Sequence, residues 1–270
     1  MTVVFTSLMA FILASPATID WIGLMVLTMG GMLVTGAANA LNQVLEKDYD
    51  RMMQRTQNRP LAMGRMTTSD AVLIAGLMPL IGTSLLAYFN VWASFFGMLA
   101  LVSYAFVYTP LKRVSSIAIP VGALPGALPI LIGAVAVQGE ITAFALALFT
   151  IQFFWQFPHF WAIGFLGFND YKKAGFKFLL DANGERDKKT GLNSFLYAML
   201  LVIIPIFLWW NGDASLWSVL AISITGIFYA KYGWNLYKEN SDKAARKLMF
   251  FSFAYMPIVL LVLTIEKFLF

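Results

Sequence analysis

The stretch "WIGLMVLTMGGMLVTGAANALNQVLEKDYDRMMQRTQNRPL", residues 21–61, joins an apolar run to a dense group of charged side chains. The run from 21 to 45 exceeds the roughly 20 residues that a helix needs to cross the hydrocarbon core of a bilayer. Charged residues are rare inside membrane helices and usually have a function there. The stretch therefore predicts a membrane helix whose end carries a polar site.

The composition predicts the same class for the whole chain. Hydrophobic residues make up 60% of its 270 residues and charged residues only 12%, against about a quarter charged in soluble domains. Apolar runs occupy residues 2–14, 21–45, 71–89, 91–109, 117–137, 141–165, 194–210, 214–232 and 248–265. The first run is short and lacks the marks of a signal peptide, so we interpret it as a shortened membrane helix. We expect an all-α polytopic membrane protein with about nine transmembrane helices, forming one domain over residues 1–270.

The basic residues test this topology independently, because Lys and Arg in short loops collect on the cytoplasmic side. Of the 19 basic residues, all but Lys267 lie in four alternate connections, 46–70, 110–116, 166–193 and 231–247. We therefore expect the amino terminus and these connections on the cytoplasmic side of a bacterial-type inner membrane. The net charge of +5 follows from this asymmetry. It suits an anionic lipid leaflet and does not indicate nucleic acid binding.

The polar end of the run 21–45 has a helical spacing. If the helix continues past residue 45, Asn42, Glu46 and Asp50 lie on one face, because they follow one another at steps of four. Asp48 then points away from them. We expect Pro60 to end this helix. A second stripe, offset by one residue around the helix, would consist of basic residues: Arg51, Arg55 and Arg59.

These residue types suit the binding of a diphosphate. Mg²⁺ prefers oxygen ligands and is typically held by one or two carboxylates together with substrate phosphate oxygens. Arg side chains can bind the remaining phosphate oxygens in bidentate fashion. The alternative is an amphipathic juxtamembrane helix whose charges only pair with one another. The positions of Asn42 and Glu46 favour a function, because a carboxylate without a role is costly where an apolar run is just ending.

Two further groups are candidates for a site. Asp170 lies at the exit of the run 141–165 and could supply a second acidic wall, whereas Asp181, Glu185 and Asp187 are better explained by a solvated loop of mixed charge. The only histidine, His159, lies inside the same run near Gln156. A buried histidine is either a hydrogen-bonded packing residue or a ligand contact, and the sequence leaves both open.

Five longer motifs resemble a known family. They are "NQVLEKDYDRMMQRTQNRPLAMGR" (42–65), "YTPLKR" (108–113), "GALPGALPILIG" (122–133), "WQFPHFWAI" (155–163) and "DYKKAG" (170–175). The first resembles the signature of the UbiA superfamily of intramembrane prenyltransferases, in the form typical of its protohaem IX farnesyltransferases. The others resemble later blocks of that subfamily in the same order. The resemblance extends from about residue 5 to the end of the chain.

The resemblance implies helices around a central cavity, with Mg²⁺ and farnesyl diphosphate bound at its cytoplasmic end. It also implies farnesyl transfer to a vinyl group of haem b (protohaem IX), with water, to give haem O, and a haem A synthase as a partner. The implied catalytic residues are Asn42, Glu46, Asp50 and Asp170, and the implied metal ligands are Glu46, Asp48, Asp50 and Asp170. The implied diphosphate contacts are Arg51, Arg55, Arg59, Lys112, Arg113, Lys172 and Lys173. His159 and Gln156 are the implied contacts of the haem acceptor.

The chain departs from the family pattern in three places. The usual Lys-Pro-Arg entry to the first helix is absent, Asn169 replaces the first acid of "DDY", and "GFKFLL" (175–180) replaces "GIPMLP". One acidic residue and two prolines are thus missing from the second block. Two alternatives stay open. One is a related enzyme that prenylates an aromatic quinone precursor, against which Glu46 and the "PHFWA" block argue. The other is a membrane transporter, which predicts no Mg²⁺-dependent diphosphate release.

Overall fold

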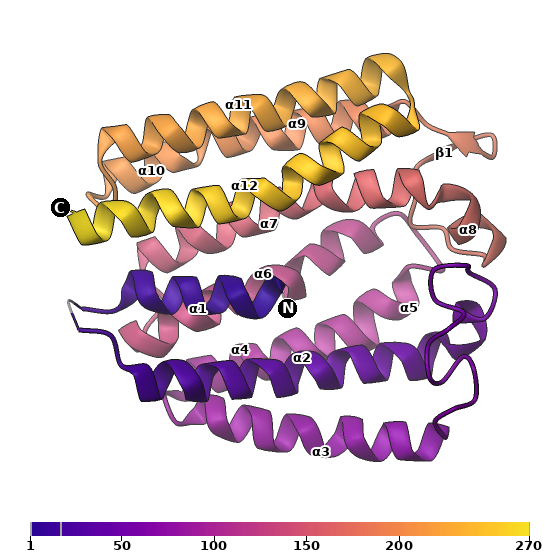
Figure 1. The fold of residues 1–270 in the computed structure, drawn as a ribbon, viewed down its shortest axis with the longest axis horizontal. Helices are drawn as coiled ribbons and strands as arrows, with labels where there is room; N and C mark the ends of the chain where they lie inside the picture. Colours follow the sequence, from indigo (N-terminus) through magenta and orange to yellow (C-terminus); the bar gives the residue numbers. More distant parts are fainter. Residues whose placement is uncertain (1, 17, 270) are drawn as a thin grey trace. The chain divides into compact units, whose positions relative to one another are not determined.

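The computed structural model describes residues 2–16 and 18–269, and it is almost entirely helical (Figure 1). Each predicted apolar run contains a helix. The helices form two compact units, Met1–Glu140 with Asn169–Phe178, and Ile141–Phe168 with Leu179–Phe270. The all-α class is confirmed. The single domain over residues 1–270 and the central cavity stay predictions.

The first unit contains the site-bearing helix α2, which packs along α3, while α6 packs along both α1 and α4 (Figure 1). A π-helix, η1, and the short α5 continue α4 without a break, so the three form one rod over residues 91–111. The elements are α1 (Thr2–Ala14), α2 (Trp21–Asp50), α3 (Thr68–Ala87), α4 (Val91–Val102), η1 (Ser103–Tyr108), α5 (Thr109–Leu111) and α6 (Ala118–Gln138). The short helix α8 (Phe168–Lys173) opens the segment 169–178.

In the second unit, α11 packs along α9 and α12, and α7 packs along α9 and α12. The elements are α7 (Ala143–Leu166), α9 (Lys189–Ile203), α10 (Pro205–Trp210), α11 (Leu216–Glu239) and α12 (Asp242–Leu269). A two-stranded hairpin, β1 (Asp181–Ala182) and β2 (Glu185–Arg186), was not predicted. Asp181 and Glu185 are exposed on it and Asp187 follows half-buried, which agrees with a solvated connection.

Local chemistry explains why α2, α4 and α7 begin within two residues of the predicted runs. Short polar side chains cap the first turns, since Asp20, Asn90 and Thr142 accept backbone N–H bonds at the starts of α2, α4 and α7. Such caps satisfy amide groups that the helix leaves without partners. Gly139 ends α6 in the left-handed conformation, with φ of 75°, which glycine adopts without steric cost.

Small residues let the helices approach closely in each unit. A Cβ atom on Gly133 of α6 would lie 1.9 Å from the Ser7 carbonyl oxygen of α1, and one on Gly191 of α9 would lie 2.1 Å from the Tyr237 nitrogen of α11. Close backbone contact through small residues is typical of helix pairs in membranes, where water exclusion does not drive association.

Six helices of the described ranges are long and apolar enough to cross a membrane: 21–50, 68–87, 91–111, 118–138, 189–210 and 242–269. Their outer faces expose large apolar side chains such as Trp21, Leu80 and Trp210, as expected where lipid is the solvent. Helix α1 is too short for this criterion. The multi-pass membrane class is thus confirmed, whereas the count of nine spans stays a prediction.

Candidate active site

A ladder of three polar side chains lies on one face of α2. Asn42, Glu46 and Asp50, together called the polar ladder, are only 5%, 3% and 1% exposed. The amide of Asn42 donates from Nδ2 to Glu46 Oε2 at 2.9 Å and to Thr109 Oγ1 at 3.2 Å. The regular helix aligns the ladder as predicted, and the bond to Thr109 ties it to α5.

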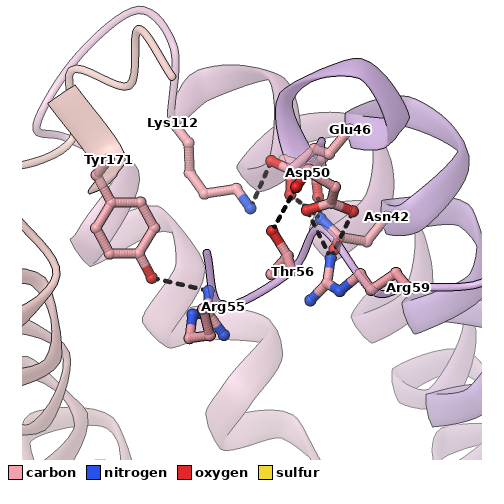
Figure 2. Close-up of polar contacts among 9 residues, drawn as sticks. Asn42, Glu46, Asp50, Arg55, Thr56, Arg59, Lys112 and Tyr171 are labelled. Atoms are coloured by element: carbon pink, nitrogen blue, oxygen red, sulfur yellow. Dashed lines mark hydrogen bonds and ion pairs between the residues drawn. The ribbon is translucent and has the colours of Figure 1, made fainter. Parts of the chain in front are cut away.

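One basic side chain neutralises each ladder carboxylate (Figure 2). Lys112 Nζ lies 2.6 Å from Glu46 Oε1, and Arg59 Nη1 donates to both oxygens of Asp50, at 3.0 and 2.8 Å. No side chain in the described ranges gives Glu46 Oε1 a well-aligned hydrogen bond, so the ammonium of Lys112 is what compensates this oxygen. Burial lowers the pKa of Lys112, and the charge of Glu46 opposes that shift. Buried charges are tolerated when they are paired, so the two bases stabilise the ladder.

The connection after α2 departs from the prediction. Helix α2 extends past residue 45 as expected but ends at Asp50, so its expected continuation to Pro60 and the arginine stripe on that continuation are wrong. Thr56 Oγ1 donates to the Asp50 carbonyl oxygen at 3.1 Å, and Arg51 Nε donates to the Ala62 carbonyl oxygen at 2.8 Å. These bonds fold the chain back on itself in a series of turns. The fold-back is what brings Arg59 to the carboxylate of Asp50 (Figure 2).

The π-helix η1 lies beside the ladder. The backbone N–H of Thr109 bonds the Tyr104 carbonyl oxygen five residues back, and Thr109 Oγ1 donates to the same oxygen at 2.9 Å. The π-turn stands directly before Pro110, which has no N–H to donate. The rings of Tyr104 and Tyr108 lie 5.3 Å apart, and Lys112 Nζ lies 5.0 Å from the centre of the Tyr108 ring. Single π-turns often mark functional sites, and this one places two aromatic rings beside a ladder ion pair.

The segment 169–178 packs against the same elements. Arg55 donates from Nη2 to the Tyr171 hydroxyl at 3.0 Å (Figure 2). Lys112 Nζ lies 5.6 Å from the centre of the Phe176 ring, and the Lys177 N–H donates to the Lys112 carbonyl oxygen at 2.9 Å. Aromatic faces attract cations at such distances, so the segment holds both Arg55 and Lys112 in place.

The structure does not gather all of the predicted site residues. Asp48 points away from the ladder, as expected from a regular helix, and 74% of its side chain is exposed. Its Oδ1 atom lies 3.3 Å from Nη1 of Arg51. Asp170 is half-buried in the first turn of α8, and within the described ranges no bond joins it to the ladder. The remaining basic candidates are Arg113, which stacks 4.6 Å over the Tyr49 ring, and the exposed Lys172 and Lys173.

The ladder fits one kind of metal site. Among residues 2–16 and 18–269, no three His, Cys, Asp or Glu side chains lie close enough to hold an ion. Mg²⁺, however, needs only one or two carboxylates when phosphate and water supply its other ligands. Glu46 and Asp50 are two such carboxylates, buried and adjacent on one helix face. The donor set therefore suits an ion that binds together with a phosphate ligand, and does not suit one held by protein alone.

His159 and Gln156 lie in the second unit, on α7. They are 8% and 2% exposed. Nδ1 of His159 lies 2.7 Å from Ser252 Oγ on α12, and its ring stacks on that of Trp155 at 5.0 Å. Gln156 Nε2 donates to the Gln152 carbonyl oxygen at 3.1 Å. Both side chains thus belong to a buried polar group inside this unit.

The sequence decides the family. A model of the UbiA prenyltransferase family matches residues 3–254. The chain belongs to this family. It is 41% identical to the protoheme IX farnesyltransferase of Flavobacterium johnsoniae, covering 99% of this chain and 91% of that protein. The relatives of the same name from Flavobacterium psychrophilum and Cytophaga hutchinsonii are 43% and 42% identical, covering 91% and 98% of this chain and 83% and 93% of theirs. The UbiA member is thus a membrane prenyltransferase, and the transporter hypothesis is displaced.

Solved structures show the same fold. A structure described as giving insights into digeranylgeranylglyceryl phosphate synthase matches with a TM-score of 0.81 and 19% identity, covering 98% of this chain and 92% of that one. A UbiA homologue from Archaeoglobus fulgidus, bound to GPP and Mg²⁺, matches with a TM-score of 0.66 and 15% identity, covering 97% and 95%. At these identities the likeness concerns the fold.

Sequence reasoning missed several residues that shape the site of this UbiA member. Thr109 and Thr56 tie the ladder to η1 and to the returning connection, and Tyr171 binds Arg55. Both threonines lie within quoted motifs, but a hydroxyl in a motif does not reveal its partner. Tyr104 was missed because a helical repeat of 3.6 residues does not predict a π-turn.

Proposed function

We propose that this prenyltransferase transfers the farnesyl group of farnesyl diphosphate to a vinyl group of haem b, giving haem O and diphosphate. The relatives that cover most of the chain are named protoheme IX farnesyltransferase, which supports the reaction. The observation that carries the proposal is the buried polar ladder. Each of its two carboxylates faces a basic side chain that can also donate hydrogen bonds to phosphate oxygens. The second candidate, an aromatic quinone precursor as acceptor, becomes an outcome of the test.

The ladder is the proposed seat of the leaving group. Asn42, Glu46 and Asp50 would hold Mg²⁺, which supplies positive charge to the departing diphosphate when bound. Lys112 and Arg59 already lie against the ladder, and both can donate to phosphate oxygens, Arg59 in bidentate fashion. Positive groups held in place before the reaction stabilise the developing charge without rearrangement of solvent. Further diphosphate contacts are proposed for the other predicted bases: Arg51, Arg55, Arg113, Lys172 and Lys173. Asp48 and Asp170 stay proposed as additional metal ligands.

The reaction balances without a side-chain nucleophile. The allylic C–O bond of farnesyl diphosphate breaks, and the farnesyl carbon bonds the terminal carbon of the vinyl group. Water adds its oxygen to the inner vinyl carbon and loses a proton, which yields the hydroxyethylfarnesyl group. Before the bond between the farnesyl and vinyl carbons forms, the allylic cation must be kept from water. The Tyr104 and Tyr108 rings beside the ladder suit this role, because aromatic faces attract cations and exclude water.

The membrane setting follows from the basic connections. The chain is a multi-pass membrane protein, and all of its basic residues except Lys267 lie in four connections, two of which contain Arg59 and Lys112. We place them on the cytoplasmic side of an inner membrane. One domain would then carry both substrates, with His159 and Gln156 near the acceptor. A haem A synthase would consume the product.

The test uses purified protein in lipid nanodiscs with Mg²⁺, farnesyl diphosphate and haem b, and mass spectrometry detects haem O. Glu46→Gln keeps the shape of the side chain and removes its charge, so we expect a fall in rate of about 100-fold or more. Glu140→Gln is the matched control, because Glu140 is exposed after α6, and it should react like the wild type.

Two results would overturn the proposal. Prenylation of 4-hydroxybenzoate in place of haem b would assign the enzyme to quinone synthesis. Equal loss of activity in both glutamate variants would remove the special role of the ladder.

A further inference from the structure

The polar group around His159 has a hydrogen-bond pattern that the transfer reaction does not use. Trp155 Nε1 on α7 donates to the Ser252 carbonyl oxygen on α12 at 2.7 Å, and the Tyr229 hydroxyl on α11 donates to the Trp155 carbonyl oxygen at 3.1 Å. Ser252, Tyr229 and Trp155 are 0%, 0% and 5% exposed. Three helices of the second unit are therefore locked around the position where Ser252 meets His159.

The two hydrogen bonds of Ser252 Oγ favour one tautomer of the histidine. A serine hydroxyl carries a single hydrogen. Ser252 Oγ donates that hydrogen to the carbonyl oxygen of Met249, because a carbonyl oxygen can only accept. Toward His159 Nδ1, 2.7 Å away, the hydroxyl can then only accept. When both of these bonds form, Nδ1 carries the ring proton and Nε2 carries the lone pair.

The surroundings leave that lone pair free and the ring neutral. In the part of the chain that the structure describes, no residue makes a hydrogen bond to Nε2. Trp155 stacks on one face of the ring at 5.0 Å, and the Phe253 ring meets it edge-on at 5.0 Å. Apolar neighbours of this kind disfavour a charged imidazolium. A neutral ring with a donated Nδ1–H and a free Nε2 is the usual arrangement of a histidine that binds a metal.

We propose that Ser252 holds His159 as the Nδ1–H tautomer, so that Nε2 binds the iron of the haem acceptor. This assignment rests on the proposed function for the identity of the acceptor. Ser252 acts as a positioning residue through His159 and does not touch the haem. Iron ligation would hold the porphyrin ring at a fixed position on the second unit. Trp155 and Phe253 would border the macrocycle with apolar rings.

The tautomer is tested first, without any substrate. The chain contains one histidine, so protein made with ¹⁵N-histidine and purified through a tag free of histidine gives ring signals from His159 alone. Nitrogen NMR in lipid should show a protonated Nδ1 and a bare Nε2. In Ser252→Ala the two tautomers should mix. A protonated Nε2 in the wild type would overturn the proposal.

Iron ligation is tested next, with ferrous haem b and no prenyl diphosphate. Resonance Raman spectra should contain an iron–histidine stretching band that moves when ¹⁵N-histidine is used. His159→Ala should lose this band, and added imidazole should restore haem binding to the folded variant. A band that is absent or insensitive to the isotope contradicts ligation by His159.

Variants at Ser252 separate positioning from packing. Loss of the orienting partner of a metal-binding histidine typically weakens the metal complex about 10- to 100-fold, so we expect that loss of haem affinity in Ser252→Ala. Ser252→Cys keeps a weaker acceptor, so its haem affinity should lie between those of the wild type and Ser252→Ala. Thr264→Ala on the same helix removes a hydroxyl that donates to the Leu260 carbonyl oxygen at 2.7 Å and should bind haem normally. An equal loss in Thr264→Ala would indicate a general packing effect and overturn the assignment.

The two proposals fail in different ways. If the wild type makes haem O and His159→Ala makes it at the same rate with an unchanged spectrum, the ligation fails and the function stands. If the Raman band is present but no haem O forms, the farnesyl transfer fails and the haem site stands.

Discussion

Lys112→Met tests whether the polar ladder depends on its counter-ions. The side chains of Lys112 and Glu46 are only 11% and 4% exposed, and Nζ lies 2.6 Å from Oε1. Methionine keeps most of the apolar stem and removes the charge. The substitution leaves the Glu46 carboxylate buried, with the amide of Asn42 as its hydrogen-bond donor. Removal of one partner from a buried ion pair costs about 3–5 kcal/mol, so we expect the free energy of unfolding to fall by that amount.

A double-mutant cycle isolates the ion pair from other effects of the substitution. Glu46→Gln combined with Lys112→Met removes both charges, and replacement of a whole buried pair by neutral groups is often close to neutral for stability. The loss caused by Lys112→Met should therefore nearly vanish in the Glu46→Gln background, and the coupling energy should reach about 3 kcal/mol or more.

The assay is denaturant unfolding of the purified proteins in one lipid–detergent mixture with EDTA. Lys243→Met is the control, because Lys243 is exposed near the start of α12, and its effect should stay within about 0.5 kcal/mol. If Lys112→Met costs as much in the Glu46→Gln background as in the wild type, the coupling is near zero. The buried ion pair would then have no part in holding the ladder.

Three further predictions follow from the same geometry. Thr109→Val removes the hydroxyl that joins α2 to η1, and unfolding should show a loss of about 1–3 kcal/mol together with a lower rate of haem O formation. Gly191→Ala places a Cβ atom 2.1 Å from the backbone of α11, so it should lower the free energy of unfolding by at least about 1–3 kcal/mol. In Gly76→Ala the added Cβ atom meets nothing within 4 Å. This control should raise the free energy of unfolding by roughly 0.5–1 kcal/mol. EDTA should abolish haem O formation, and added Mg²⁺ should restore it. Asp50→Asn should raise the Mg²⁺ concentration needed for half-maximal activity far more than Asp48→Asn does, because Asp50 is buried and Asp48 is exposed. Equal effects within either matched pair would contradict the corresponding geometry.

The helices and the ladder could be predicted because they depend on local properties of the chain. A run of about 20 apolar residues must be helical in a bilayer, since no water satisfies its backbone groups. Residues four apart on such a helix lie on one face, so the alignment of Asn42, Glu46 and Asp50 follows from their spacing. The exposure of Asp48 follows from the same rule.

The surroundings of the ladder could not be predicted, because they depend on contacts between distant segments. The spacing of the basic residues after Asp50 fits a helix as well as it fits turns, and the bond from Thr56 to the Asp50 carbonyl oxygen favours the turns. Similarly, the π-turn depends on the hydroxyl of Thr109 and on the proline that follows it. The hydrogen-bond partner of His159 Nδ1 is Ser252, which is 93 residues away along the chain.

Residues 175–180, where the sequence departs from the family pattern, make contacts that explain the departure. Where the family pattern has its first proline, this chain has Lys177, whose N–H donates to the Lys112 carbonyl oxygen, and a proline has no such hydrogen to give. Phe176 and Phe178 flank it, both buried, and their rings lie 5.8 and 4.8 Å from that of Tyr171. A backbone hydrogen bond and an aromatic cluster thus stiffen the segment 169–178 where the family uses prolines. Because the bond ends on Lys112, the altered block supports the very base that neutralises Glu46.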